Sequence, residues 1–280
     1  MAYDTVLEIL SMLPKKLEAL IQFLEEICVA SGFVARLLAS LRGKLQHYSL
    51  CIHHIRVVCA SISLILGESD DQEWDRAVFV PPALRDVFIW VRDHIKSSGF
   101  VAMGRPLWPL IPSSAYGAFS RGEPVDAKPL LVVTCDASVH GWGAVVRTSP
   151  SEEPLVLVGH FRSLDAFHSQ RTFQLYDGGD DPESQVHRET KAIVLAVSEA
   201  SRHFALRDYS LLIRSDCQPA LAVLLKGSST SESLQRESLS FARFCAAHEM
   251  ATPLFLHIPG AQMVAEGVDE LSRQDAAQAG

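Results

Sequence analysis

The sequence lacks a long apolar segment, a paired cysteine motif and a signal-peptide pattern. No apolar run reaches the roughly 18 residues that a membrane-spanning helix needs. The acidic Asp4 and Glu8 stand where a secretory signal would be basic and then apolar. The six cysteines are scattered without a Cys-x-x-Cys pair, which favours reduced core cysteines over a zinc site. We therefore expect no membrane partner and a cytoplasmic or nuclear location.

The chain also lacks an overall basic charge. Its formal net charge of −8 counts against sequence-independent binding of nucleic acid, which usually uses a basic surface. The charge is uneven, however, because residues 27–67 contain no Asp or Glu. This segment is either a buried helix pair or a surface that faces nucleic acid through its cations, which are Arg36, Arg42, Lys44 and Arg56.

What the chain does have is enough apolar residues for a sizeable core. It has 280 residues, of which 48% are hydrophobic and 21% charged, as in globular proteins. Residues 1–98 show helical spacing and predict a helical module. One helical stretch of this module is expected from about Ala35 to Leu66, with an interruption near Gly43. Residues 99–129 are rich in Gly, Pro and Ser and predict a linker.

Residues 130–280 have a different, α/β pattern. The apolar run Leu130 to Thr134 predicts a buried strand. Residues 162–185 are polar and predict a solvated loop. Further strands are expected at 141–147 and 155–160, as antiparallel neighbours, and at 210–215 and 253–258. Helices are expected at 189–205, 219–225, 231–248 and 264–277.

Two carboxylates follow apolar strands of this α/β region. Asp136 comes after the first strand, and Asp216 comes directly after the strand at 210–215. If these strands are parallel neighbours, both carboxylates lie at the same edge of the sheet, where ligands gather in α/β folds. A turn-forming aspartate is the alternative interpretation for either residue alone.

Glu189 is harder to explain by structure alone. Apolar residues follow it at positions +3, +4 and +7, so it heads the core-facing stripe of its helix. Burial of a carboxylate there costs several kcal/mol unless it is paired or bound to a metal. The alternative is a glutamate at a helix N-terminus, which the helix dipole favours. Asp269 lies near the start of the last predicted helix. Considered by itself, it is typical of a solvated first-turn residue.

Four segments carry these acids in the order Asp, Glu, Asp, Asp. They read Thr134-Cys135-Asp136-Ala137-Ser138-Val139-His140-Gly141-Trp142-Gly143-Ala144, Glu189-Thr190-Lys191-Ala192, Ser215-Asp216-Cys217, and His257-Ile258-Pro259-Gly260 with Val268-Asp269-Glu270-Leu271-Ser272-Arg273. Together they resemble the ribonuclease H domain of retroelement reverse transcriptases, in particular of DIRS-type retrotransposons. More weakly, Leu38 to Lys44 is similar to the thumb of these enzymes, and Asp86 to Pro109 to their connection.

The resemblance implies a ribonuclease H-like, mixed five-stranded sheet flanked by helices, preceded by an all-α module like a thumb and connection. It implies two-metal hydrolysis of the RNA strand in RNA–DNA hybrids. Asp136, Glu189, Asp216 and Asp269 would be the catalytic metal ligands. Carboxylates are hard oxygen ligands suited to two Mg²⁺ ions, with Mn²⁺ as a substitute. The expected partners are the hybrid and the polymerase part of a reverse transcriptase.

The chain departs from the family in ways that leave alternatives open. The adjacent aspartates of a polymerase palm have no match, because Asp70-Asp71 and Asp180-Asp181 lie in polar segments. The chain alone should therefore not polymerise DNA. One alternative is a non-catalytic, retroelement-derived module that binds nucleic acid or a polymerase. Another is a transposase-like or integrase-like nuclease, which is disfavoured because its Glu comes last whereas Glu189 comes second.

Overall fold

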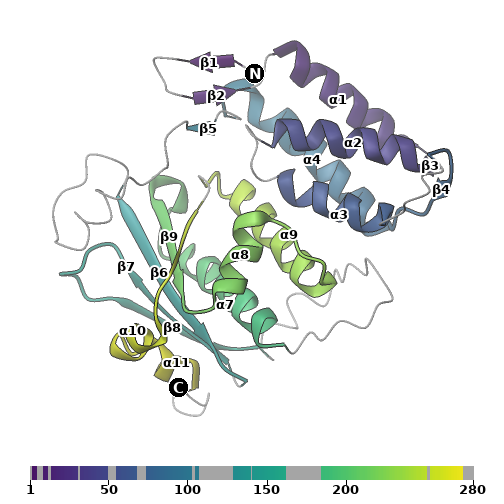
Figure 1. Cartoon of the computed structure of the whole chain (residues 1–280). Helices are drawn as coiled ribbons and strands as arrows, with labels where there is room; N and C mark the ends of the chain where they lie inside the picture. The colour runs from purple at the N-terminus through teal and green to yellow at the C-terminus, as the bar shows by residue number, and fades with distance from the viewer. Residues whose placement is uncertain are drawn as a thin grey trace. The chain divides into compact units, whose positions relative to one another are not determined.

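The computed structural model divides into two compact units (Figure 1). The helical unit comprises Met1–Pro109 and the later segment Gly227–Gln235, and the α/β unit contains the rest of the described chain. The structure describes residues 2–4, 9–11, 14–30, 32–49, 55–67, 74–102, 105–106, 129–139, 141–161, 184–250 and 253–273. Most of the loop predicted at 162–185 and most of the linker predicted at 99–129 lie outside these residues. The predicted end of the loop is one residue too late, because Gln185 already belongs to a helix.

Four helices lie in the described part of residues 1–109. They are α1 (Pro14–Val29), α2 (Ala35–Tyr48), α3 (Arg56–Leu66) and α4 (Pro82–Ala102). Helix α1 packs against α4, and α2 packs against α3. The predicted interruption near Gly43 is wrong, because α2 continues through this residue to Tyr48. The predicted start of the linker at residue 99 is also too early, because α4 continues to Ala102.

The sequence predicted an all-α module, but this prediction is wrong, because the helical unit also contains short strands. Short strands β1 (Ala2–Asp4), β2 (Ile9–Ser11) and β5 (Arg105–Pro106) form one small sheet. Strand β3 (Phe33–Val34) pairs antiparallel with β4 (Ala77–Val78), where aromatic and β-branched residues suit an extended backbone. Within the described residues, no helix has both the length and the apolar character that crossing a membrane requires.

The segment Gly227–Gln235 belongs to the helical unit although the sequence places it in the α/β half. Gln235 is fully buried there. Its amide nitrogen donates hydrogen bonds to the carbonyl oxygen of Val57 at 3.0 Å and to the hydroxyl of Ser61 at 3.2 Å. A buried amide needs such partners, so these bonds explain why the segment groups with α3.

The α/β unit is built on one mixed, five-stranded sheet, as predicted (Figure 1). The strands are β6 (Leu130–Ala137), β7 (Gly141–Arg147), β8 (Leu155–His160), β9 (Ser210–Ser215) and β10 (Leu254–His257). Their order is β10-β9-β6-β7-β8. Strand β7 runs antiparallel to both β6 and β8, which confirms the prediction for β7 and β8, whereas β9 runs parallel to both β6 and β10.

Helices flank this sheet. They are α7 (Gln185–Ala200), α8 (Gln218–Lys226), α9 (Glu232–Ala247), α10 (Gly260–Ala265) and α11 (Val268–Arg273), with a short 3₁₀ turn, η3 (Leu206–Asp208). The single closing helix predicted at 264–277 is wrong. Two short helices occupy this region, and Gly267 between them has a φ of 76°, a left-handed conformation that favours glycine and ends α10. Residues 274–280 lie outside the described part.

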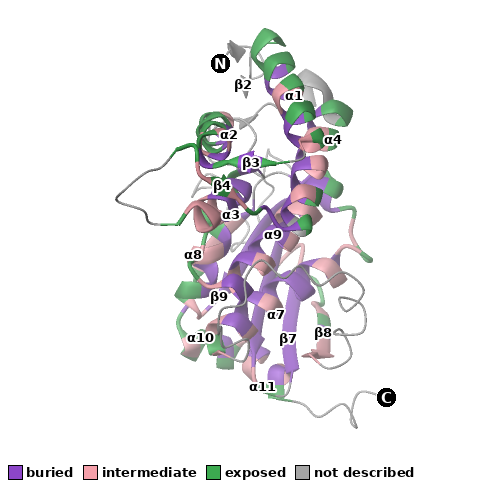
Figure 2. Cartoon of the chain, turned by 90° about the vertical axis from the view of Figure 1, so that its right-hand side faces the viewer, coloured by how far each residue is buried: buried purple, intermediate pink, exposed green. Residues whose placement is uncertain are grey.

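Both faces of the central strand β6 are buried. The neighbouring strand β7 is also mostly buried and is drawn purple in Figure 2. Leu131, Val133 and Cys135 point to the larger core, which α7, α8 and α9 complete. The opposite face of β7 carries Val145, which packs with Val268 and other residues of the last two helices. Strands alternate their side chains between faces, so Asp136 points to the face that α11 covers.

Helix α11 can approach this face closely because position 143 is a glycine. A Cβ atom at Gly143 would lie 2.4 Å from the Cβ of Leu271 and 2.7 Å from the backbone nitrogen of Ser272. Atoms at these separations overlap, so any side chain would push α11 away from the sheet. Gly143 pairs with Asp136 across the β6–β7 ladder, so the close approach occurs directly beside this carboxylate.

We expect Gly143→Ala to destabilise the α/β unit by roughly 1–3 kcal/mol, because it overpacks the contact with α11. Gly43→Ala is the matched control, since a Cβ at Gly43 in α2 meets no atom within 4 Å. That change should stabilise its helix by about 0.5–1 kcal/mol. Urea unfolding followed by amide hydrogen exchange of β6, β7 and α2 measures both effects. Equal effects of the two substitutions would contradict the close approach.

Candidate metal centre

Strand register places Asp136 level with Asp216. The parallel β6–β9 ladder ends at the pair Thr134–Arg214, and each aspartate lies two residues beyond its member of that pair. Strand β6 extends to Ala137 rather than ending at Thr134, so Asp136 lies inside the strand and is only 7% exposed. Asp216 directly follows β9 and is half-buried. The carboxyl ends of two parallel neighbours therefore present both side chains at one edge of the sheet.

Helix α7 brings the third carboxylate to the same edge. This helix begins at Gln185, where the hydroxyl of Ser184 caps it by accepting a hydrogen bond from the backbone N–H of His187 at 3.2 Å. Glu189 therefore lies in the second turn and not at the N-terminus, because α7 covers Gln185–Ala200 and not the predicted 189–205. The helix dipole acts mainly within the first turn, so it does not account for the burial of Glu189, which is 3% exposed.

Three carboxylates converge at this edge. Asp136, Glu189 and Asp216 each offer an oxygen atom, and these atoms lie within 4.8 Å of one another. We refer to these three residues as the carboxylate cluster. Such a set of hard oxygen donors, two of them buried, could hold a metal ion.

Burial and mutual repulsion change the proton affinity of the cluster. Burial, assisted by the neighbouring Asp136, raises the pKa of Glu189 from 4.5 to about 8. Burial also raises the pKa of Asp136, while the hydroxyl of Ser272 opposes this shift. Without a cation, Glu189 therefore carries a proton at neutral pH. A bound cation would favour the ionised form and release this proton.

The hydrogen bonds of Glu189 leave one of its two oxygen atoms unused. The Glu189 Oε1 atom accepts a hydrogen bond of 2.7 Å from the amide of Gln185. The Oε2 atom of Glu189 is buried and has no hydrogen-bond partner. A buried oxygen without a partner is costly in a folded protein. Together with the all-oxygen donor set, this atom fits a site for a hard cation.

Asp269 is not a member of the carboxylate cluster. It lies in α11 with 29% of its side chain exposed, and its Oδ1 atom pairs with Arg273 at 2.7 Å. Its charge still contributes to raising the pKa of Asp136. The structure thus brings three of the four predicted ligands together and places the fourth on the helix that packs beside them.

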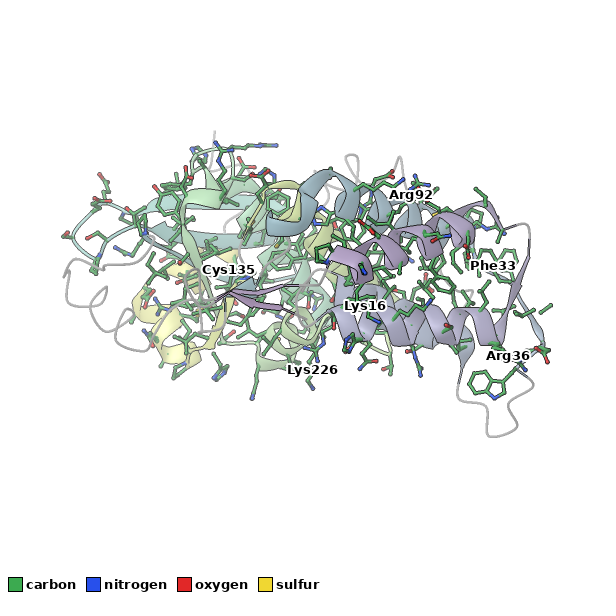
Figure 3. The ribbon with its side chains drawn as sticks, turned by 90° about the horizontal axis from the view of Figure 1, so that it is seen from above. Lys16, Phe33, Arg36, Arg92, Cys135 and Lys226 are labelled. Carbon is green, nitrogen blue, oxygen red and sulfur yellow. The ribbon has the colours of Figure 1, made fainter. Side chains whose placement is uncertain are left out.

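The four predicted nucleic-acid-binding cations lie in the helical unit, and all are exposed. Burial of the helix pair therefore does not explain why acidic residues are absent around them. Arg36 forms an ion pair of 3.2 Å with Asp75, at the same end of the unit as Phe33 (Figure 3). The Lys44 ammonium lies 3.5 Å from the centre of the Phe23 ring, and Arg42 donates to the hydroxyl of Ser63 at 3.4 Å.

Two residues of the site were not identified from the sequence. Ser272 donates a hydrogen bond of 2.7 Å to the Oδ2 atom of Asp136, and Gln185 donates to Glu189. For Gln185, a signal was present, because a glutamine four residues before a glutamate on one helix lies on the same face. For Ser272, the contact joins residues 136 positions apart, which no local pattern indicates.

Comparisons with known proteins give no assignment. The sequence matches no protein-family model, and no curated protein matches it significantly.

Glu189→Gln should stabilise the metal-free chain at alkaline pH. Between pH 4.5 and about 8 the unfolded chain releases the Glu189 proton while the folded chain keeps it, so stability falls as pH rises through this window. Glutamine does not titrate, so the variant does not lose this stability. We expect its gain in the free energy of unfolding to be roughly 2–4 kcal/mol at pH 8.5.

Thermal and urea unfolding in EDTA at pH 4.5 and 8.5 would measure the effect. Glu199→Gln, at a partly exposed position of the same helix, serves as the control and should show no comparable gain. If Glu189→Gln gave the same gain at both pH values, ionisation of the buried carboxyl would not be its cause.

Proposed function

We propose that this chain hydrolyses the RNA strand of RNA–DNA hybrids, as the nuclease part of a retroelement reverse transcriptase. One observation carries the proposal: carboxylates from β6, α7 and the end of β9 converge within 4.8 Å although they are far apart in the chain. The unpartnered Oε2 atom of Glu189 adds an independent reason to expect a cation there.

The fold supports the same proposal. The mixed sheet of order β10-β9-β6-β7-β8, with helices packed against it, is compatible with a ribonuclease H-like fold. The acids follow in the order Asp136, Glu189, Asp216 and Asp269, as in the family that the motifs resemble. The second position of Glu189 disfavours a transposase-like or integrase-like nuclease.

Asp136, Glu189 and Asp216 would hold the metal ions, with Asp269 beside them. Mg²⁺ suits this set because its ligands are hard oxygen atoms, and Mn²⁺ would substitute. When bound, two such ions supply an activated water and stabilise the leaving oxygen of a phosphodiester. The chain itself orients the carboxylates through β6, β9 and α7, and it keeps Glu189 away from bulk water.

RNA would be distinguished from DNA by its 2′-hydroxyl groups and by the A-form shape of the hybrid. The exposed cations of the helical unit, which include Arg42 and Lys44 on α2, would bind phosphates of the duplex. The polymerase part of a reverse transcriptase remains the second proposed partner, because the motifs of a palm are absent from this sequence.

Purified chain with Mg²⁺ should cleave the labelled RNA of an RNA–DNA hybrid and leave single-stranded RNA and duplex DNA intact. Asp136→Asn should reduce the rate by about a thousandfold, because the site loses several kcal/mol of charge stabilisation. EDTA should abolish the activity. Hybrid binding without cleavage, unchanged by Asp136→Asn, would favour the alternative of a non-catalytic module that binds nucleic acid or a polymerase.

The role of the helical cations can be tested separately. We expect Arg42→Ala with Lys44→Ala to weaken binding of the hybrid, measured on the Asp136→Asn background so that no cleavage occurs. Each lost phosphate contact should reduce the slope of log K against log salt concentration by about one. Arg202→Ala is the control and should leave the slope unchanged, because Arg202 is an exposed arginine in the turn after α7 and pairs with Glu199. An unchanged slope in the double variant would exclude phosphate contacts by these two cations.

A further inference from the structure

We propose that Ser272 and Gln185 are positioning residues of the metal centre. Each holds one oxygen atom of a ligand carboxylate and leaves the other oxygen for the cation. This inference rests on the proposed function and adds two residues to it. It follows from the hydrogen bonds of the two buried acids of the carboxylate cluster, Asp136 and Glu189, whose side chains receive neutral donors.

Ser272 fixes Asp136. Its hydroxyl lies 2.7 Å from the Oδ2 atom of Asp136 and 3.0 Å from the carbonyl oxygen of Asp269. The residue is 1% exposed, so water does not compete for these contacts. Its own carbonyl oxygen accepts a hydrogen bond of 2.6 Å from the hydroxyl of Ser138, which anchors α11 to the turn after β6. Ser272 thereby fixes the orientation of the Asp136 carboxylate through its Oδ2 atom.

Gln185 fixes Glu189 in a corresponding way. Its amide nitrogen donates to the Oε1 atom of Glu189 at 2.7 Å and to the carbonyl oxygen of Ala137 at 3.1 Å. One side chain thus ties the first turn of α7 to the end of β6. The consequence is that Oε1 is occupied, whereas the buried Oε2 atom has no partner.

The donors are a hydroxyl and an amide, and neither carries a charge. A lysine or arginine at either position would neutralise the carboxylate and compete with a metal ion. A neutral donor restrains the orientation and leaves the negative charge for the cation, which is the role of outer-shell partners in metal sites. Asp269 differs in this respect, because the guanidinium of Arg273 pairs with it.

The test uses binding of Mn²⁺ to the full chain, measured from the paramagnetic resonance signal of the free ion. Ser272→Ala and Gln185→Leu should each weaken Mn²⁺ affinity by about 10- to 100-fold. Ser272→Thr keeps the hydroxyl and should restore most of the affinity. The melting temperature of each metal-free variant is recorded as well, so that binding is compared only between folded chains.

Two matched controls separate positioning from stability. Ser238→Ala removes a buried hydroxyl of the same unit that faces the carbonyl oxygen of Val223, away from the cluster. Gln262→Leu removes the glutamine of a second pair with the same spacing, in which Gln262 donates to Glu266 at 3.0 Å. Both should bind Mn²⁺ as the wild type does.

The possible failures are distinguishable. If wild-type chain and Asp136→Asn bind Mn²⁺ equally weakly, the metal centre and the proposed function fail together. If the wild type binds and Asp136→Asn does not, while Ser272→Ala and Gln185→Leu match the wild type, only the positioning role is overturned.

Discussion

Hydrogen bonds between β6 and β9 set the register that brings Asp136 level with Asp216. A shift of one residue in this ladder would turn the side chains of one strand to the opposite face of the sheet and separate the two carboxylates. The register is held by apolar side chains on both faces, since every residue of β6 is buried. The same apolar core that stabilises the sheet therefore also fixes the geometry of a highly polar site.

The carboxylate cluster opposes the stability of the unit that contains it. Three acids share a small volume, and the most buried one, Glu189, is held at a pKa of about 8. Buried carboxylates that repel one another are kept in folded proteins mainly at functional sites, where a bound ligand offsets the repulsion. A cation would remove both the repulsion and the unmet hydrogen-bonding need of Glu189 Oε2, so binding and folding would stabilise each other.

Local patterns predicted the strands of the α/β unit well, because β7, β8 and β9 are bounded by turn residues and carry continuous or alternating apolar side chains. They missed the short strands of the helical unit, which have only two or three residues each. They failed where long-range packing decides. Gly43 does not interrupt α2, whose buried leucines continue on both sides of it. Gly267 divides the closing helix although the apolar spacing continues through it. The sequence motifs indicated Asp136, Glu189 and Asp216, but the exposure of Asp269 and its pairing with Arg273 depend on tertiary contacts.

The hydrogen bond between Ser272 and Asp136 joins residues 136 positions apart. Contacts of such long sequence separation form late in folding, because the loop between them must first be closed. During synthesis, β6 and α7 leave the ribosome well before α11 does. The carboxylate of Asp136 therefore lacks its serine partner until α11 has been made, so the site is completed only after β6, α7 and β9 have all been synthesised.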